Sequence, residues 1–263
     1  MGKCPDICLS STVTDMFREL GQMLVLFGAT LRALPGFLRR RRSIGEQIFE
    51  IGNASLLMAC MLSFFIGGVL VLQAGSVLVE RGLGSQLGGL VGISLCKELA
   101  PVMMAILIAG RVGSAMAAEL GSMQVYQEVD ALRTLNIEPI DYLVLPRIVA
   151  ITIALPALVV FSNLVGWLGG AAVASFNSDI GIPTATFFSN LREVVDTWDI
   201  AHGLIKAFVF AMAVGTVCCH QGLQTRGGPR GVGRSVTKAV TNSIVLVLLL
   251  DYVLTRLLQP FDA

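Results

Sequence analysis

Long apolar stretches separated by short polar ones run along the chain. No charged residue occurs from Ile51 to Val79 or from Ile148 to Ser178, and a helix needs about 20 apolar residues to cross a membrane. Three further apolar stretches run from about Leu87 to Ala118, from Ile200 to Cys219 and from Val236 to Leu258. The pattern predicts an all-α integral membrane protein, a single domain over residues 1–263 with five transmembrane helices within residues 46–260.

An amphipathic helix is predicted ahead of the first span. Its apolar positions recur at helical spacing: Leu20, Leu24, Phe27, Leu31, Leu34 and Leu38. Arg39 to Arg42 follow as four consecutive cations, which suit anionic lipid headgroups. We interpret residues 1–45 as an N-terminal interfacial helix and a basic segment, with an additional membrane span as the alternative. Acidic residues before the apolar part argue against a secretory signal.

Small residues form one face of the helix that ends the second apolar stretch. Ala109, Gly113, Ala117 and Gly121 recur every four residues. Such a face allows close helix packing within a bilayer. We expect another helix to lie against it.

A short charged segment, about residues 122–137, separates the second and third spans. Val125, Val129, Leu132 and Leu135 share one helical stripe, and the charged residues face elsewhere. This pattern predicts a surface helix available to a soluble partner. The alternative is a solvated helix with no partner.

Two adjacent charges, Lys97 and Glu98, lie inside the second apolar stretch. Charges at membrane depth cost a few kcal/mol, so they usually face a cavity or a partner. One hypothesis pairs them with residues of other helices, and the other places them at the polar edge of a lipid-binding cavity. Pro101, just beyond them, is expected to loosen the local helical hydrogen bonding.

The first span supplies candidates for the wall of such a cavity. Leu70, Val77 and Leu78 are apolar and recur at helical spacing, with Gln73 as a polar interruption. Together with Lys97 and Glu98 they form the predicted lipid-binding set. The same four residues of the first span would also suit ordinary core or lipid-facing positions.

The composition agrees with a membrane protein. Hydrophobic residues make up 54% of the chain, charged residues 14%, and the mean hydropathy is +0.76. A net charge of +1 without a basic, aromatic-lined groove gives no indication of nucleic-acid binding. Most of the six cysteines lie in or beside apolar stretches, which indicates packing rather than metal binding.

No catalytic motif is visible. The two histidines, His202 and His220, lie at opposite ends of the fourth span without a Ser or Cys partner at meaningful spacing. The glycine-rich loop from Gly222 to Arg234 lacks the Lys-Ser/Thr of a nucleotide-binding loop. We therefore expect no enzyme activity, no metal and no cofactor bound by this chain.

Lysine and arginine placement predicts the orientation. With the N-terminus, the 119–141 segment and the 222–234 loop on one side, most cations fall on that side. The positive-inside rule makes that side cytoplasmic. Five spans then leave the C-terminus on the outer side of the membrane.

Several motifs in one order carry a family resemblance. They are Lys97–Pro101, Gly110–Ala115, Ala118–Met123, Glu128–Leu132 and Tyr142–Arg147. With the hydrophobic layout of nearly the whole chain, they resemble the MlaE/YrbE permeases of bacterial ABC-type lipid transport systems.

The resemblance implies a function and a set of partners. A homodimer of five-span permeases in the bacterial inner membrane would move glycerophospholipids between the inner and outer membranes. The implied partners are an ABC ATPase subunit (MlaF-like) that uses ATP and Mg, an MCE-domain ring protein (MlaD-like) and, in some members, a STAS-domain subunit (MlaB-like). The surface segment would be the coupling helix, with contact to the ATPase through Glu128, Asp130, Ala131, Leu132 and Arg133.

Two other function classes remain open. A non-transporting scaffold that anchors a soluble complex would explain the surface helix but not Lys97 and Glu98. A secondary transporter is the other class, although no inverted-repeat symmetry is evident between the halves.

Overall fold

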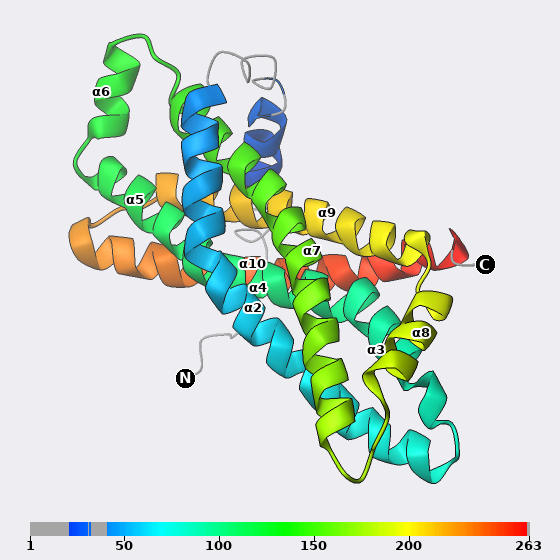
Figure 1. Ribbon diagram of the computed structural model, residues 1–263. Coiled ribbons are helices and arrows are strands. Elements are labelled where there is room, and N and C mark those ends of the chain that lie inside the picture. The colour runs from blue at the N-terminus through cyan, green and yellow to red at the C-terminus, as the bar shows by residue number, and fades with distance from the viewer. Residues whose placement is uncertain (1–20, 31, 33–40, 262–263) are drawn as a thin grey trace, which may run out of the picture.

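The computed structural model describes residues 21–30, 32 and 41–261, and all regular structure in these residues is helical (Figure 1). Five helical segments are long and apolar enough to cross a membrane. They are α2 (Arg41–Glu80), a composite second segment (Gly84–Val125), a third segment (Ile140–Phe176) that contains α7 (Leu145–Phe176), α9 (Thr197–Leu223) and α10 (Gly228–Leu258). The predicted all-α fold with five spans is confirmed.

The second segment is not one regular α-helix. After a short 3-10 turn, η2 (Gly84–Gln86), it consists of α3 (Leu87–Ser94), the π-helical turn η3 (Leu95–Leu99), α4 (Ala100–Ile108), a second π-helical turn η4 (Ala109–Gly113) and α5 (Ser114–Val125). Pro101 lies in the first turn of α4 and has no N–H to donate. The expected loosening is therefore observed, as the π-turn that holds Lys97 and Glu98.

Helices α2 and α7 run side by side in the same direction (Figure 1). Gly67 lies directly against the backbone of Gly166, and Gly169 lies against the backbone of Phe64. The hydroxyl groups of Ser63 and Ser162 form a short, buried hydrogen bond at the same crossing. Small residues thus let the two backbones touch, as expected where lipid supplies no hydrophobic drive for helix association.

The predicted small-residue face is also confirmed. Ala109, Gly113, Ala117 and Gly121 are all buried. The face packs on α9 and the residues after it: Gly113 lies against Cys218, and Gly121 lies against Thr225.

Two short helices mark opposite ends of the bundle (Figure 1). Helix α6 (Glu128–Thr134) follows α5, and α8 (Thr184–Val194) packs on α3. The coupling segment predicted at 122–137 is helical over a shorter range, because α5 continues to Val125. Left-handed residues then bracket α6: Gln127 has φ 61° and Asn136 has φ 58°.

The structure describes only part of the predicted interfacial helix and basic segment at residues 1–45. A helix spans Gly21–Thr30, whereas residues 1–20, 31 and 33–40 lie outside the described residues. Arg39 and Arg40 of the predicted basic segment are among these. The first long helix begins at Arg41, so the predicted boundary at residue 45 falls inside α2.

Candidate functional site

A lysine inside the bundle holds the most prominent polar contacts of the described chain. Lys206 of α9 has a fully buried side chain. Its Nζ donates to Glu98 Oε2 at 2.7 Å, to Asp251 Oδ1 at 2.9 Å and to Thr255 Oγ1 at 2.7 Å. An ammonium group has three hydrogens, so all three are used. We call Glu98, Lys206, Asp251 and Thr255 the charge cluster.

The cluster joins three segments that are far apart in the sequence. Glu98 comes from η3, Lys206 from α9, and Asp251 and Thr255 from one face of α10. The Thr255 hydroxyl lies 3.2 Å from Glu98 Oε1 and 2.8 Å from the Asp251 carbonyl oxygen. The hydroxyl therefore accepts from the lysine and donates its single hydrogen either to the Glu98 carboxylate or to the Asp251 backbone carbonyl.

A second ion pair lies beside the cluster. Lys97 Nζ is 2.9 Å from Asp199 Oδ1. The other Asp199 oxygen accepts from the Asp196 backbone N–H at 3.0 Å and completes the capping box at the start of α9. The adjacent residues Lys97 and Glu98 thus contact positions about two turns apart on one helix.

A glycine permits this close contact between η3 and α9. Gly203 lies between Asp199 and Lys206 in the sequence, and a Cβ there would collide with the backbone oxygen of Cys96. With a larger residue the two segments would separate. The ion pairs on either side of Gly203 would then lengthen.

The cluster opens to the outside of this chain. The Lys206 side chain is 0% exposed, whereas the Glu98 side chain is 40% exposed and that of Asp251 is 22% exposed. A carboxylate on a membrane-spanning helix is costly unless it faces water, a polar ligand or another protein. The accessible oxygens therefore mark a surface that needs a polar neighbour.

The structure changes the argument for the predicted lipid-binding set. Both Lys97 and Glu98 form ion pairs with residues of other helices. A lipid-binding cavity is therefore not needed to compensate these two charges. Their proposed contact with a headgroup stays a prediction. It now rests on the exposed part of the Glu98 carboxylate.

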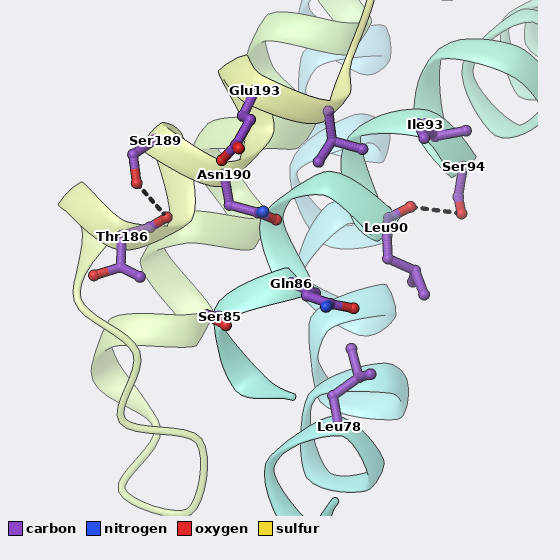
Figure 2. Close-up of a pocket in the computed structure, with 11 residues that line it drawn as sticks. Leu78, Ser85, Gln86, Leu90, Ile93, Ser94, Thr186, Ser189, Asn190 and Glu193 are labelled. Atoms are coloured by element: carbon purple, nitrogen blue, oxygen red, sulfur yellow. Dashed lines mark hydrogen bonds between the residues drawn. The ribbon is translucent and has the colours of Figure 1, made fainter. Parts of the chain in front are cut away.

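The predicted wall residues on α2 do not lie together. Leu70 and Leu78 pack, half-buried, against a core that includes Val71 and Leu87, whereas Gln73 and Val77 are exposed. Leu78 alone of the six predicted residues lines a cavity of about 780 Å³. Figure 2 shows this cavity between α3 and α8, bordered by side chains such as Ser94 and Asn190.

The sequence analysis did not select four residues of these contacts: Asp199, Lys206, Asp251 and Thr255. The signal was present, because an ionisable residue inside a membrane span is by default a candidate functional residue with a partner to be found.

The predicted coupling residues lie on α6. Val129 is buried and Leu132 packs beside it, while Glu128, Asp130, Ala131 and Arg133 are exposed. Asp130 and Arg133 pair with each other at 3.0 Å. The amphipathic character of this helix is confirmed at Val129 and Leu132, and its outer face is available for contact. Leu135, predicted on the same stripe, is exposed because α6 ends at Thr134.

No metal centre is found in the described part of the chain: its histidines, cysteines and acidic residues form no group of three or more that could hold an ion. Cys96, Cys218 and Cys219 are buried in the bundle. Their burial agrees with the predicted packing role. Cys4 and Cys8 lie outside the described residues.

Comparison with known proteins identifies similar permeases over most of the chain. Residues 44–257 match a family model described as permease MlaE. A probable ABC transporter permease protein of Synechocystis is 38% identical over 92% of this chain and 91% of its own length. The intermembrane phospholipid transport system permease protein MlaE of Haemophilus influenzae is 33% identical over 95% of each chain. The chloroplastic protein TRIGALACTOSYLDIACYLGLYCEROL 1 of Arabidopsis thaliana is 35% identical over 91% of this chain and 68% of its own.

Proposed function

The chain belongs to the MlaE permease family, and on this basis we propose that it is the membrane-spanning subunit of an ATP-driven transporter of glycerophospholipid. A relative similar over nearly its full length is named for intermembrane phospholipid transport. The observation that carries the proposal is the charge cluster, which places partly exposed carboxylates of Glu98 and Asp251 on transmembrane helices. A purely structural ion pair would need no such exposure.

The cluster suits a lipid headgroup. The partly exposed carboxylates of Glu98 and Asp251 can accept further hydrogen bonds from an ammonium group. Lys97, a compact and rotatable donor, can turn toward a phosphate. The acyl chains would lie along α2, where the predicted wall consists of the exposed Gln73 and Val77 and the half-buried Leu70 and Leu78.

A second copy of the chain would complete this site. Only 11% of the most apolar window of α10 is buried, and its exposed residues are Val245, Leu248, Leu249, Tyr252, Val253 and Leu257. The same helix carries Asp251 and Thr255. A homodimer formed through α10 would bring two charge clusters close to its axis, where they enclose one polar cavity between the subunits.

In this proposal, a partner subunit supplies the energy for phospholipid transfer. An ABC ATPase subunit would bind at α6 and hydrolyse ATP with Mg, so this chain is a permease and not itself an ATPase. An MCE-domain ring protein would bind at the opposite end, beside α8. A STAS-domain subunit would bind the ATPase in those systems that have one.

The proposed orientation places α6 in the cytoplasm and α8 in the periplasm of an inner membrane. In a cysteine-free background, a cysteine at Ser85 is expected to react with a membrane-impermeant thiol reagent in intact spheroplasts. A cysteine at Gln127 is expected to react only after permeabilisation. Both positions are exposed in the structure, so access to the reagent depends on the side of the membrane. Labelling of Gln127 in intact spheroplasts would contradict the orientation.

Charge reversal on α6 tests the coupling to an ATPase. We expect Glu128→Lys with Asp130→Lys to release the ATPase subunit on purification and to abolish ATP-driven phospholipid transfer between vesicles. Losing one partner of a buried interfacial charge pair typically costs about 2–5 kcal/mol. The exposed Asp130–Arg133 pair contributes at most about 1 kcal/mol to stability, so the amount of permease in the membrane should not change.

Asp179→Lys is the matched control, because Asp179 is an exposed acid at the opposite end of the bundle. It should retain the ATPase subunit. The scaffold hypothesis makes a different prediction: a parental complex that hydrolyses ATP and transfers no phospholipid. Full ATPase retention by the double α6 variant would remove α6 from the coupling interface.

A further inference from the structure

A small cavity of about 150 Å³ lies in the half of the bundle nearer to α6. It is enclosed by the first turns of α2, by the η4–α5 region and by the start of α7. Its polar lining consists of Gln47, Glu50, Arg111, Glu119 and Arg147. The charge cluster lies in the opposite half, near the start of α9, and shares no residue with this cavity.

Arg147 has a hydrogen-bond donor that meets no acceptor among the described residues. Its side chain is 12% exposed, and Nη2 donates to Glu119 Oε2 at 2.8 Å. The other terminal nitrogen, Nη1, is buried and has no acceptor among the described residues. Because a buried unmet donor carries a desolvation cost, this nitrogen favours an acceptor supplied from outside the chain.

Arg111 also has spare donors, although its side chain is exposed. Its Nη1 donates to the Met58 sulfur at 2.8 Å, and a thioether is a weak acceptor. No ion pair of Arg111 is found among the described residues, although Arg111 and Arg147 line the same cavity. Two guanidinium groups with spare donors form a suitable arrangement for a phosphate, which they bind through charge-assisted hydrogen bonds.

The cavity also offers acceptors. Gln47 Oε1 is buried without a donor among the described residues. Glu50 is an exposed carboxylate one helical turn further along α2, and Glu119 leaves most of its carboxylate exposed. A ligand that carries both an anion and a positively charged hydrogen-bond donor would therefore satisfy this lining.

The surroundings indicate a lipid source for that ligand. Ile51, Val112 and Met116 form the apolar part of the lining. Leu57 and Met58, about two turns further along α2, are exposed apolar side chains. The cavity is smaller than the roughly 300–1,000 Å³ typical of drug-sized ligands, so it can accept a headgroup while the acyl chains remain outside against α2.

We propose that this cavity binds the headgroup of a zwitterionic phospholipid with a primary amine. The phosphate contacts Arg111 and Arg147, and the ammonium contacts Gln47, Glu50 and Glu119. This headgroup site is distinct from the charge cluster. Binding here requires no ATP and no transfer step.

Photocrosslinking in nanodiscs tests the proposal. The complex with its ATPase, without nucleotide, is placed in phosphatidylcholine nanodiscs that contain a small fraction of phosphatidylethanolamine with a photoreactive group near the glycerol. We expect mass spectrometry to find crosslinks on α2 near Met58 and on α5. Arg111→Gln and Arg147→Gln should each lower this yield about tenfold. Arg256→Gln, an exposed arginine at the far end of α10, should leave the yield unchanged.

Competition identifies the ligand. Unlabelled phosphatidylethanolamine should displace the probe more effectively than phosphatidylglycerol, and Glu50→Gln should remove that preference. Inorganic phosphate should not compete. Competition by phosphate as effective as that by the lipid would overturn the proposal in favour of a free-anion site.

Arg111→Gln keeps the test decisive even if Arg147→Gln fails to fold, because Arg111 gives up only a thioether contact. Unchanged crosslinking in Arg111→Gln would also overturn the proposal. The outcome is independent of the proposed function: crosslinks at this site in a complex that shows no ATP-driven transfer would leave the headgroup site standing and reject the transport role.

Discussion

Replacing Lys206 by methionine is expected to abolish phospholipid transfer and to lower the thermal stability of the purified protein. The ammonium group satisfies Glu98, Asp251 and Thr255 from a fully buried position. Without it, two carboxylates remain side by side in the bundle. Removing one partner of a buried ion pair typically costs about 3–5 kcal/mol. Thermal unfolding in detergent and ATP-driven transfer between vesicles are the two measurements.

A second variant separates the structural contribution of the cluster from its role in transfer. Lys206→Met combined with Glu98→Gln and Asp251→Asn removes the charges together. Neutral replacement of a whole buried ion pair is often tolerated, so stability should largely return. Transfer should not return, because the exposed carboxylate oxygens are lost. Transfer at the parental rate by the triple variant would show that the cluster only holds the helices together.

The sequence was sufficient to predict the spans and the surface helix, because these depend on local pattern. An uncharged run such as Ile51–Val79 can be satisfied in a bilayer only by a helix that meets its own backbone hydrogen bonds. The amphipathic stripe through Val129 and Leu132 likewise predicted which face of α6 is buried. Even the irregular turn at Lys97 and Glu98 followed from the position of Pro101.

The partners of these charges could not be predicted in the same way. Glu98 and Lys206 are 108 residues apart in the sequence, and no local pattern links them. The two π-turns add a further difficulty. Each turn accommodates an extra residue and rotates the following helix by about 100° relative to a regular α-helix. A helical wheel drawn through the second span therefore assigns wrong relative directions to residues on either side of η3.

The predicted wall residues of α2 do not lie on one surface, and this too depends on contacts that a local pattern does not contain. Leu70, Val77 and Leu78 are apolar at helical spacing, but apolar residues of a membrane helix suit the core and the lipid equally well. Hydropathy therefore cannot distinguish half-buried Leu78 from exposed Val77. Leu78 is half-buried because it packs against a core that includes Leu87 and Val91 of α3, whereas the Val77 side chain is exposed.

Gly67→Ala is expected to weaken the α2–α7 crossing on which the bundle is built. A single methyl group at Gly67 would overlap the backbone oxygen of Gly166, which cannot move aside as a flexible side chain would. The helices must then separate, and overpacking of this kind typically costs about 1–3 kcal/mol or more. Gly52→Ala is the matched control on the same helix, because a Cβ there meets nothing within 4 Å. Alanine is the better helix former by up to about 1 kcal/mol, so Gly52→Ala should be neutral or stabilising while Gly67→Ala lowers Tm by several °C. Equal Tm values for the two variants would mean that the backbone contact at Gly67 does not limit the packing of α2 on α7.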